Sequence, residues 1–130
     1  MTSNSEIVRS TTQAMERGDQ LAVMGHLARD LVWNVHAADP GAAPWFGVYE
    51  GKRGIADFLD DLASVGFTRA ETTELIAEGD TVMTVTELAF DGSNGRHVEV
   101  GEVQVWRLVD GKIVSVDVYL DTAAIAAAFA

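Results

Sequence analysis

The chain has 130 residues, of which 48% are hydrophobic and 22% charged, and its formal net charge is −11. This length and composition predict one globular domain spanning residues 1–130. The acidic excess excludes nucleic acid and anionic membrane surfaces as partners, because like charges repel. The absence of cysteine excludes disulfides, thiolate nucleophiles and cysteine metal sites. No signal-peptide pattern or apolar run of transmembrane length is present, so we expect a cytoplasmic protein.

The first half of the chain predicts three helices and one strand. The helices are expected at residues 2–17, 20–27 and 51–66, and the strand at residues 30–36. The third helix carries an apolar stripe at helical spacing, consisting of Ile55, Phe58, Leu59 and Leu62. The strand alternates apolar and polar residues. Between this strand and the third helix, residues 37–50 are expected to form a loop whose aromatic side chains fold over an apolar interior.

The second half of the chain predicts two hairpins and a closing helix. The first hairpin joins strands at residues 68–77 and 81–90. The second occupies the stretch from Gly95 to Asp121, with a turn at residues 109–112, because Asp-Gly between alternating apolar runs is a strong hairpin signal. Residues 122–130 form the closing helix. This order predicts an α+β fold in which helices cover one face of a largely antiparallel sheet.

Two polar residues interrupt an apolar face of the penultimate strand. Because side chains alternate along a strand, one face carries Val98, Val100, Glu102, Gln104, Trp106 and Leu108. If this face lines a cavity, burial raises the pKa of Glu102 toward the range of a useful general acid or base. In the alternative register, Glu102 faces water beside Glu99.

Several short motifs follow one another along nearly the whole chain. They are Gly18-Asp19, Asp30 with Val32-Trp33, Gly47-x-Tyr49-x-Gly51 before Ile55 and Phe58, Gly79-Asp80-x-Val82, Asp110-Gly111-Lys112-Ile113 and Tyr119-x-Asp121. In this order the chain resembles the nuclear transport factor 2-like superfamily, and within it the SnoaL-like polyketide cyclase and ketosteroid isomerase branch. The resemblance implies a curved, cone-shaped sheet that three helices close around an apolar pocket. It also implies a homodimer formed through the outer face of the sheet.

The catalytic positions of these relatives are matched only in part. By resemblance to ketosteroid isomerase, the tyrosine of the first helix falls at Thr11, and the general base falls near Val35, beside His36. The protonated aspartate of the oxyanion hole falls at Gln104, whose amide can still donate a hydrogen bond. The arginine and two aspartates of the limonene epoxide hydrolase relatives fall at Thr86, Leu88 and Val118. The chain therefore resembles neither enzyme in its familiar form.

Three residues are candidates for catalysis. Glu102 is the candidate for proton transfer, Gln104 for the oxyanion donor and His36 for a second titrating group. For Gln104, a buried amide bonded to a neighbouring side chain is an equal alternative, and for His36, alternation favours a surface or interface position. Ligand-binding side chains are expected at Trp33, Val35, Trp45, Tyr49, Phe58, Leu62, Val100, Val116, Val118 and Leu120. Such aromatic residues also serve as ordinary core.

These residues predict a cofactor-independent acid/base enzyme. It isomerises, cyclises or hydrates a hydrophobic carbonyl compound, such as a polyketide-like or terpenoid-like metabolite. No metal or organic cofactor is expected, since the histidines lack metal-ligand spacing. The alternative is a non-catalytic protein that binds a small apolar ligand, or a dimerisation module. Polar groups that converge in the cavity favour the enzyme.

Overall fold

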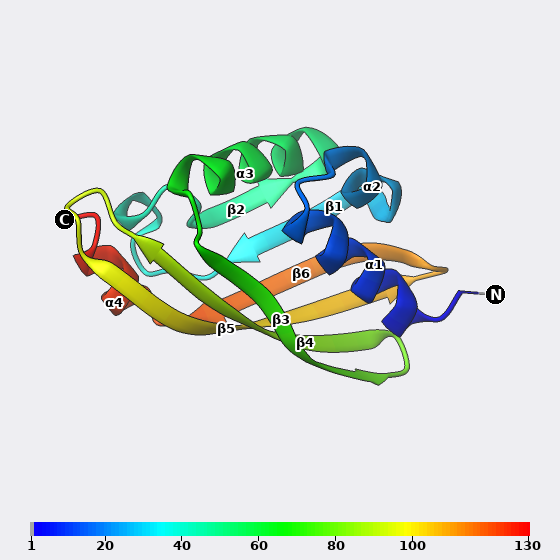
Figure 1. The fold of residues 1–130 in the computed structure, drawn as a ribbon. Helices are drawn as coiled ribbons and strands as arrows, with labels where there is room; N and C mark the ends of the chain where they lie inside the picture. Colours follow the sequence, from blue (N-terminus) through cyan, green and yellow to red (C-terminus); the bar gives the residue numbers. More distant parts are fainter. Residues whose placement is uncertain (1) are drawn as a thin grey trace.

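The computed structural model describes residues 2–130, which form a curved six-stranded sheet with helices on one face (Figure 1). The helices are α1 (Asn4–Glu16), α2 (Gln20–Gly25), α3 (Gly51–Val65) and α4 (Thr122–Ala127), with a 3₁₀ turn η1 (Pro40–Ala42). The strands are β1 (Leu27–Val35), β2 (Gly47–Glu50), β3 (Arg69–Glu78), β4 (Thr81–Asp91), β5 (His97–Val109) and β6 (Lys112–Leu120). The α+β fold expected from the sequence is confirmed.

The sheet has the strand order β2-β1-β6-β5-β4-β3. Strand β1 runs parallel to β6, and all other neighbours are antiparallel. The β5–β6 turn has positive φ at both central residues, 49° at Asp110 and 76° at Gly111. This backbone is the one that an Asp-Gly pair favours in a two-residue hairpin. The turn sets the pairing of Leu108 with Ile113, and a register shift between Arg107 and Leu108 then brings Gln104 opposite Val118.

Helices α1, α2 and α3 lie on the concave face of the sheet (Figure 1). Ser3 caps the N-terminus of helix α1, since its hydroxyl accepts a hydrogen bond from the Glu6 backbone N–H. Asp19 caps α2, since its carboxylate accepts from the Ala22 backbone N–H. Helix α3 buries Ile55 and Phe58 against the core. The helices and the sheet thus enclose one interior, as the apolar stripes predicted.

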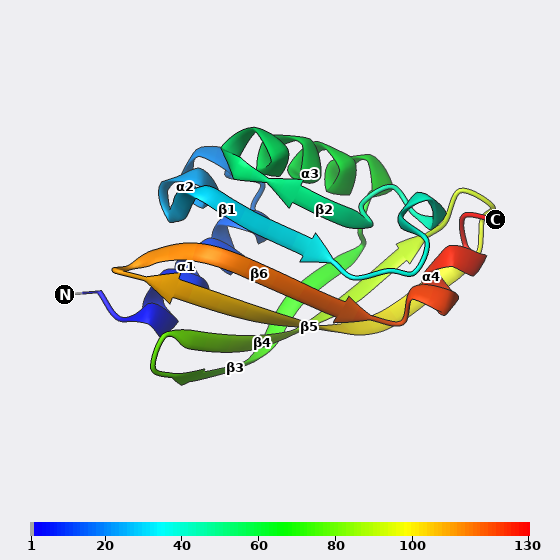
Figure 2. The ribbon, with the colours of Figure 1, turned by 180° about the vertical axis from the view of Figure 1, so that it is seen from behind.

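Helices α1, α2 and α3 leave the outer face of the sheet uncovered (Figure 2). Figure 2 shows β1, β6 and β5 in front, with α1 behind them. Five of the seven large apolar side chains that are exposed belong to this outer face, namely Val32, Val48, Ile76, Met83 and Tyr119. Their positions alternate with inward-facing residues of the same strands. No helix of residues 2–130 is long and apolar enough to cross a membrane.

Several expected element boundaries are wrong. The strand expected at residues 30–36 is β1, which begins at Leu27, and the closing helix expected at residues 122–130 ends at Ala127. The segment 37–50 is not a loop throughout, because its end forms β2, which pairs with β1 at the sheet edge. Four residues are too few to show a clear alternation in the sequence. The second helix ends at Gly25 rather than at residue 27, and Leu27 already pairs with Ile113 of β6.

Candidate functional site

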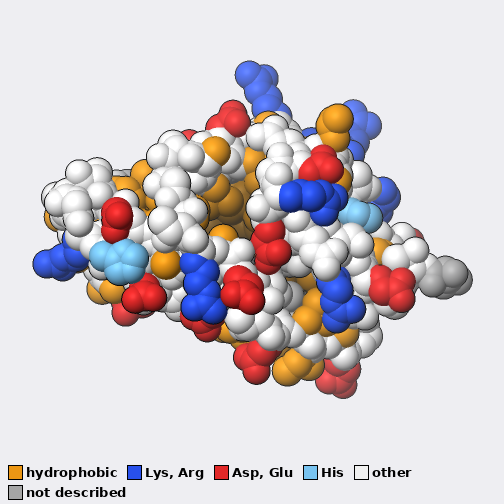
Figure 3. Space-filling view, viewed as in Figure 1, with side chains coloured by type: hydrophobic (Ala, Val, Ile, Leu, Met, Phe, Trp, Pro, Cys, Tyr) orange, Lys and Arg blue, Asp and Glu red, His pale blue; other side chains and the backbone are white. Residues whose placement is uncertain are grey.

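A cavity of about 520 Å³ lies between the concave face of the sheet and the helices. Its volume falls within the range of small-molecule sites, roughly 300–1,000 Å³. Figure 3 shows a hollow with hydrophobic side chains in its interior. The lining residues that remain exposed mark its mouth. They come from the α1–α2 turn (residues 16–18 and 20), from Ala63 and Gly66 at the end of α3, and from Ala70 of β3. The cavity therefore opens between α1 and the α3–β3 connection.

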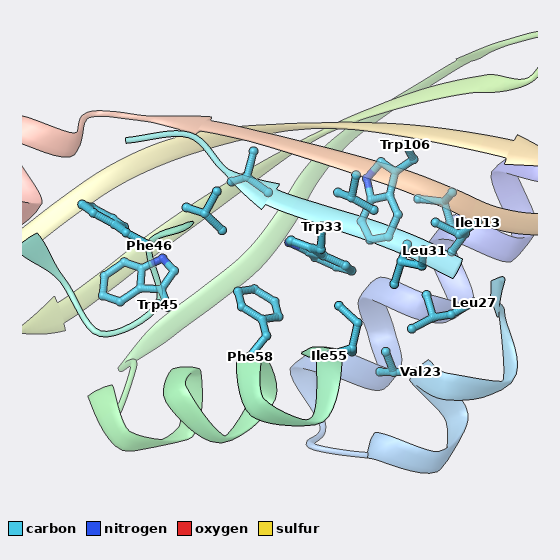
Figure 4. Close-up of a cluster of buried hydrophobic side chains, with 14 of the residues drawn as sticks. Val23, Leu27, Leu31, Trp33, Trp45, Phe46, Ile55, Phe58, Trp106 and Ile113 are labelled. Carbon is cyan, nitrogen blue, oxygen red and sulfur yellow. The ribbon is translucent and has the colours of Figure 1, made fainter. Parts of the chain in front are cut away.

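Six of the ten side chains expected to bind a ligand line this cavity. They are Trp33, Val35, Trp45, Phe58, Leu62 and Val118. Phe58 of α3 points toward Trp33 of β1, with ring centroids 5.0 Å apart (Figure 4). Trp33 also meets the edge of Trp106 at 5.3 Å. These rings form a rigid apolar wall that suits a flat or ring-containing molecule.

The other four side chains of that set are not part of the cavity wall. Tyr49 lies at the sheet edge, where its hydroxyl donates to Asp61 Oδ2 over 3.1 Å, and burial raises its pKa. Val116 faces inward but is fully covered by the core, and Val100 and Leu120 pack at the margin of the core. An inward-facing strand position is therefore not sufficient to reach the hollow.

Glu102 and Gln104 both face the cavity from β5. Gln104 Nε2 donates a hydrogen bond to Glu102 Oε1, and its second hydrogen is directed to Thr86 Oγ1 at 3.0 Å. Within residues 2–130, Glu102 has no other hydrogen bond or ion pair. One carboxylate oxygen is thus held by protein, and the other has no hydrogen-bond partner within residues 2–130. Both N–H groups of Gln104 are engaged, so neither is free for a substrate oxygen in this arrangement.

Burial raises the pKa of Glu102 from its ordinary value of 4.5 to about 7. The hydrogen bond from Gln104 acts in the opposite direction, since it stabilises the carboxylate, but burial is the larger cause. The side chain keeps accessible surface because it borders the cavity. A carboxyl with a pKa near neutrality is present in both its ionised and its protonated form at pH 7, so it can take up a proton and return it.

A row of buried polar side chains supports Gln104 from the neighbouring strand β4. Thr84 Oγ1 donates to Gln104 Oε1 over 2.6 Å, and Trp106 Nε1 donates to Thr84 Oγ1 over 2.8 Å. Thr86 Oγ1 lies 3.2 Å from Gln104 Oε1 and 3.3 Å from Thr72 Oγ1. The sequence alone gave no prediction of this network. The threonines alternate along residues 84–86, but their contact with Gln104 depends on the β4–β5 register, in which Thr84 stands opposite Gln104.

His36 lies on the other face of the sheet, as strand alternation favoured, so it is not the second catalytic group of the cavity that was its alternative role. Its Nε2 is 2.8 Å from Asp117 Oδ1, and its ring stacks on Tyr119 with centroids 4.6 Å apart. Arg107 Nη1 holds the second oxygen of Asp117 over 3.0 Å. The His36 backbone N–H donates to Val118 O over 3.0 Å, so the chain keeps the alternation of β1 and does not bend inward. His36 therefore belongs to the outer face.

The remaining polar groups add little to the interior. The Trp33 Nε1 atom is buried and has no hydrogen-bond partner within residues 2–130. Because it is covered, it offers no donor to a molecule in the cavity. In the same part of the chain, no group of three or more histidine, aspartate or glutamate residues is placed to hold a metal ion. The interior chemistry thus centres on Glu102 and Gln104.

Comparison with known proteins gives one family and many structures of the same fold. The family model of the SnoaL-like domain, in the nuclear transport factor 2-like (NTF2-like) superfamily, matches residues 8–116. An NTF2-like protein from Burkholderia thailandensis E264 is 28% identical, with a TM-score of 0.87 and 98% of each chain covered. No curated protein sequence matches the chain.

Two further structures share the fold at lower identity. TerC, co-crystallised with polyporic acid, is 24% identical, with a TM-score of 0.83 and 96% of each chain covered. A Mesorhizobium loti protein assigned to the SnoaL-like polyketide cyclases is 17% identical, with a TM-score of 0.74, and the match covers 91% of this chain and 99% of that one. At these identities the likeness shows the fold alone.

Proposed function

Since the chain belongs to the SnoaL-like domain family of the NTF2-like superfamily, we propose that it is an enzyme. It acts on a hydrophobic carbonyl compound by acid/base catalysis and needs no cofactor. The observation that carries the proposal is the position of Glu102. It is a carboxyl in a mostly apolar cavity, its pKa is raised to about 7, and one of its oxygens has no hydrogen-bond partner within residues 2–130. Few other side chains of the interior can exchange a proton.

The proposed reaction begins with proton abstraction. The ionised Glu102 takes a proton from the carbon next to the substrate carbonyl, and the electrons of the broken C–H bond form an enolate. The protonated Glu102 then returns this proton to another carbon, which gives an isomer. Where the enolate carbon attacks a second carbonyl of the same molecule, the proton goes to the new alkoxide and a ring is formed. Neither route changes the oxidation state of the substrate as a whole.

The cavity favours a neutral, ring-containing substrate. Its wall includes Trp33, Trp45 and Phe58, and its volume of about 520 Å³ suits a molecule of drug size. A net charge of −11 disfavours a substrate with several negative charges. The co-crystallisation of TerC with polyporic acid supports a small organic ligand for a relative of this fold. A polyketide-like or terpenoid-like ketone fits these conditions.

Deuterium exchange tests the proposal without knowledge of the product. The protein is incubated in D₂O with a panel of aryl ketones and β-diketones, and deuterium at the carbon next to the carbonyl is measured by mass spectrometry. We expect catalysed exchange for at least one bound ketone, and its loss in Glu102→Gln. Glu99→Gln is the matched control, because Glu99 is exposed on the same strand and does not line the cavity. Equal exchange by the wild type and Glu102→Gln contradicts the proposal.

A non-catalytic ligand-binding protein is the second candidate. It is favoured by the fact that both Gln104 N–H groups are already bonded and that none of the three histidines lines the cavity. Native mass spectrometry of protein isolated from its source separates the two candidates. An unchanged co-purifying molecule that the protein never converts favours the binding protein, whereas turnover of that molecule favours the enzyme.

A further inference from the structure

We propose that Trp106 and Thr84 are positioning residues, which orient the amide of Gln104 so that its NH₂ group, and not its carbonyl, faces Glu102. The catalytic role of this orientation rests on the proposed function. The orientation lets Gln104 hold one oxygen of Glu102 and leaves the other oxygen for a substrate. It concerns a property of the free protein, however, and can be tested without a substrate.

The direction of the hydrogen bonds begins at Trp106. An indole N–H can only donate, so the bond of 2.8 Å from Trp106 Nε1 obliges Thr84 Oγ1 to accept. The single hydrogen of the Thr84 hydroxyl is then available for Gln104, 2.6 Å away. A hydroxyl that donates needs an acceptor, and the only acceptor of a glutamine side chain is its carbonyl oxygen. The carbonyl of Gln104 is therefore drawn toward Thr84.

Thr86 does not select either orientation. Its Oγ1 lies 3.0 Å from Gln104 Nε2 and 3.2 Å from Gln104 Oε1. A hydroxyl can donate or accept, and its neighbour Thr72 at 3.3 Å is another hydroxyl with the same freedom. Either orientation of the Gln104 amide satisfies this side of the network. The selection consequently comes from Thr84, and through it from Trp106.

The orientation decides what Glu102 meets. With the carbonyl directed to Thr84, Nε2 donates to Glu102 Oε1, which favours the ionised carboxylate. With the amide reversed, the carbonyl of Gln104 faces Glu102, and only the protonated carboxyl can bond to it. Trp106, Thr84 and Gln104 are all buried, so water does not replace a lost partner easily. The indole N–H thus acts on the carboxylate through two intervening side chains.

A carboxyl titration by NMR tests the inference. Protein labelled with ¹³C in its glutamate side chains is titrated, and the Glu102 signal is identified by its absence in Glu102→Gln. We expect Thr84→Val and Trp106→Phe to raise the midpoint of Glu102 by about one pH unit or more, because the bond that favours the charged form is no longer enforced. Thr84→Ser keeps the hydroxyl, and we expect it to keep the wild-type midpoint.

Two outcomes overturn the inference. One is a folded Thr84→Val protein whose Glu102 midpoint is unchanged, because a purely structural threonine alters the melting temperature alone. The other is found in the wild type, which needs no variant to fold. The ¹⁵N chemical shift of the Gln104 side-chain amide should change with pH, with the same midpoint as the Glu102 carboxyl. A chemical shift that does not change over this pH range shows that the NH₂ group does not face Glu102. If the midpoints shift as expected but no ketone undergoes exchange, the positioning network stands and the proposed function fails.

Discussion

Gln104 donates a hydrogen bond to Glu102 from two residues further along the same strand, and both side chains face the cavity. Neighbours at this spacing share a face because side chains alternate along β5. The pair puts a donor next to a carboxyl whose pKa burial raises to about 7. The predictions below follow from this arrangement, from the cavity around it and from the outer face of the sheet.

The first prediction concerns stability and pH. At high pH, Glu102 is ionised in both the folded and the unfolded protein. Its pKa is about 7 in the folded protein, against the ordinary value of 4.5 that applies in the unfolded chain. The folded protein therefore binds this proton more tightly, and ionisation costs it stability as the pH rises from about 4.5 to about 7. Glu102→Gln removes that cost, and the stability it gains relative to wild type should be about 2 kcal/mol larger at pH 8 than at pH 5.5.

Urea unfolding of both proteins at these two pH values measures the difference. Glu74→Gln is the control, because Glu74 is exposed on β3, does not line the cavity and makes no ion pair within residues 2–130. A gain for Glu102→Gln that is equal at both pH values disproves the raised pKa.

The second prediction concerns catalysis. If ionised Glu102 is the base, the rate of deuterium exchange into a bound ketone should rise with pH and level off above about pH 7. Glu102→Gln should lower this rate by roughly 10²- to 10⁴-fold, which is the usual contribution of a general base. Its affinity for the ketone should change little, since the amide is isosteric. A rate profile that is flat across neutrality in the wild type argues against Glu102.

The third prediction concerns the cavity mouth. Ala63 lies on α3, is exposed and borders the cavity, so a larger side chain there should obstruct entry without disturbing the core. We expect Ala63→Trp to weaken binding of the neutral dye Nile red about tenfold or more, equivalent to about 1.4 kcal/mol. Arg53→Trp is the control, because Arg53 is exposed on the same helix away from the cavity. Equal affinities in the two variants contradict this account of the entrance.

The fourth prediction concerns assembly. We propose that the chain forms a homodimer through the outer face of the sheet, where Val32, Val48, Ile76, Met83 and Tyr119 expose apolar surface. Tyr119→Glu places a charge in this face, beside Asp117, and should shift the protein from twice the mass of the chain to the mass of one chain. Light scattering coupled to size-exclusion chromatography measures this. Leu21→Glu, at a highly exposed position on α2, should leave the mass unchanged, and a wild-type monomer rules the proposal out.

Strand alternation in the sequence predicts the fold and the orientation of the central pair. The period of two is strict along β5, which has 13 residues, so Glu102 and Gln104 had to share the face of Trp106. The hairpin turn at Asp110-Gly111 joins β5 to β6, and a register shift between Arg107 and Leu108 completes the alignment that places Val118 opposite Gln104. Long strands and a specific turn thus constrain each other, whereas the four residues of β2 give no such pattern.

The supporting network could not be predicted because it depends on pairing between strands. Thr84 contacts Gln104 only because β4 and β5 are aligned with these residues opposite each other. A different register would place another residue there. Strand alternation favoured a surface position for His36, and its backbone bond to Val118 continues that pattern at the end of β1. Its contacts there with Asp117 and Tyr119 depend on the pairing of β1 with β6. Local sequence does not determine such contacts.

The titration of Glu102 in the wild-type protein tests the central claim most directly. Its ¹³C carboxyl signal, assigned by comparison with Glu102→Gln, gives the pKa of the group with no substrate and no assumed reaction. We expect a midpoint near 7, because burial disfavours the charged form of this carboxyl. A midpoint near the ordinary value of 4.5 shows a well-solvated carboxylate and contradicts the account.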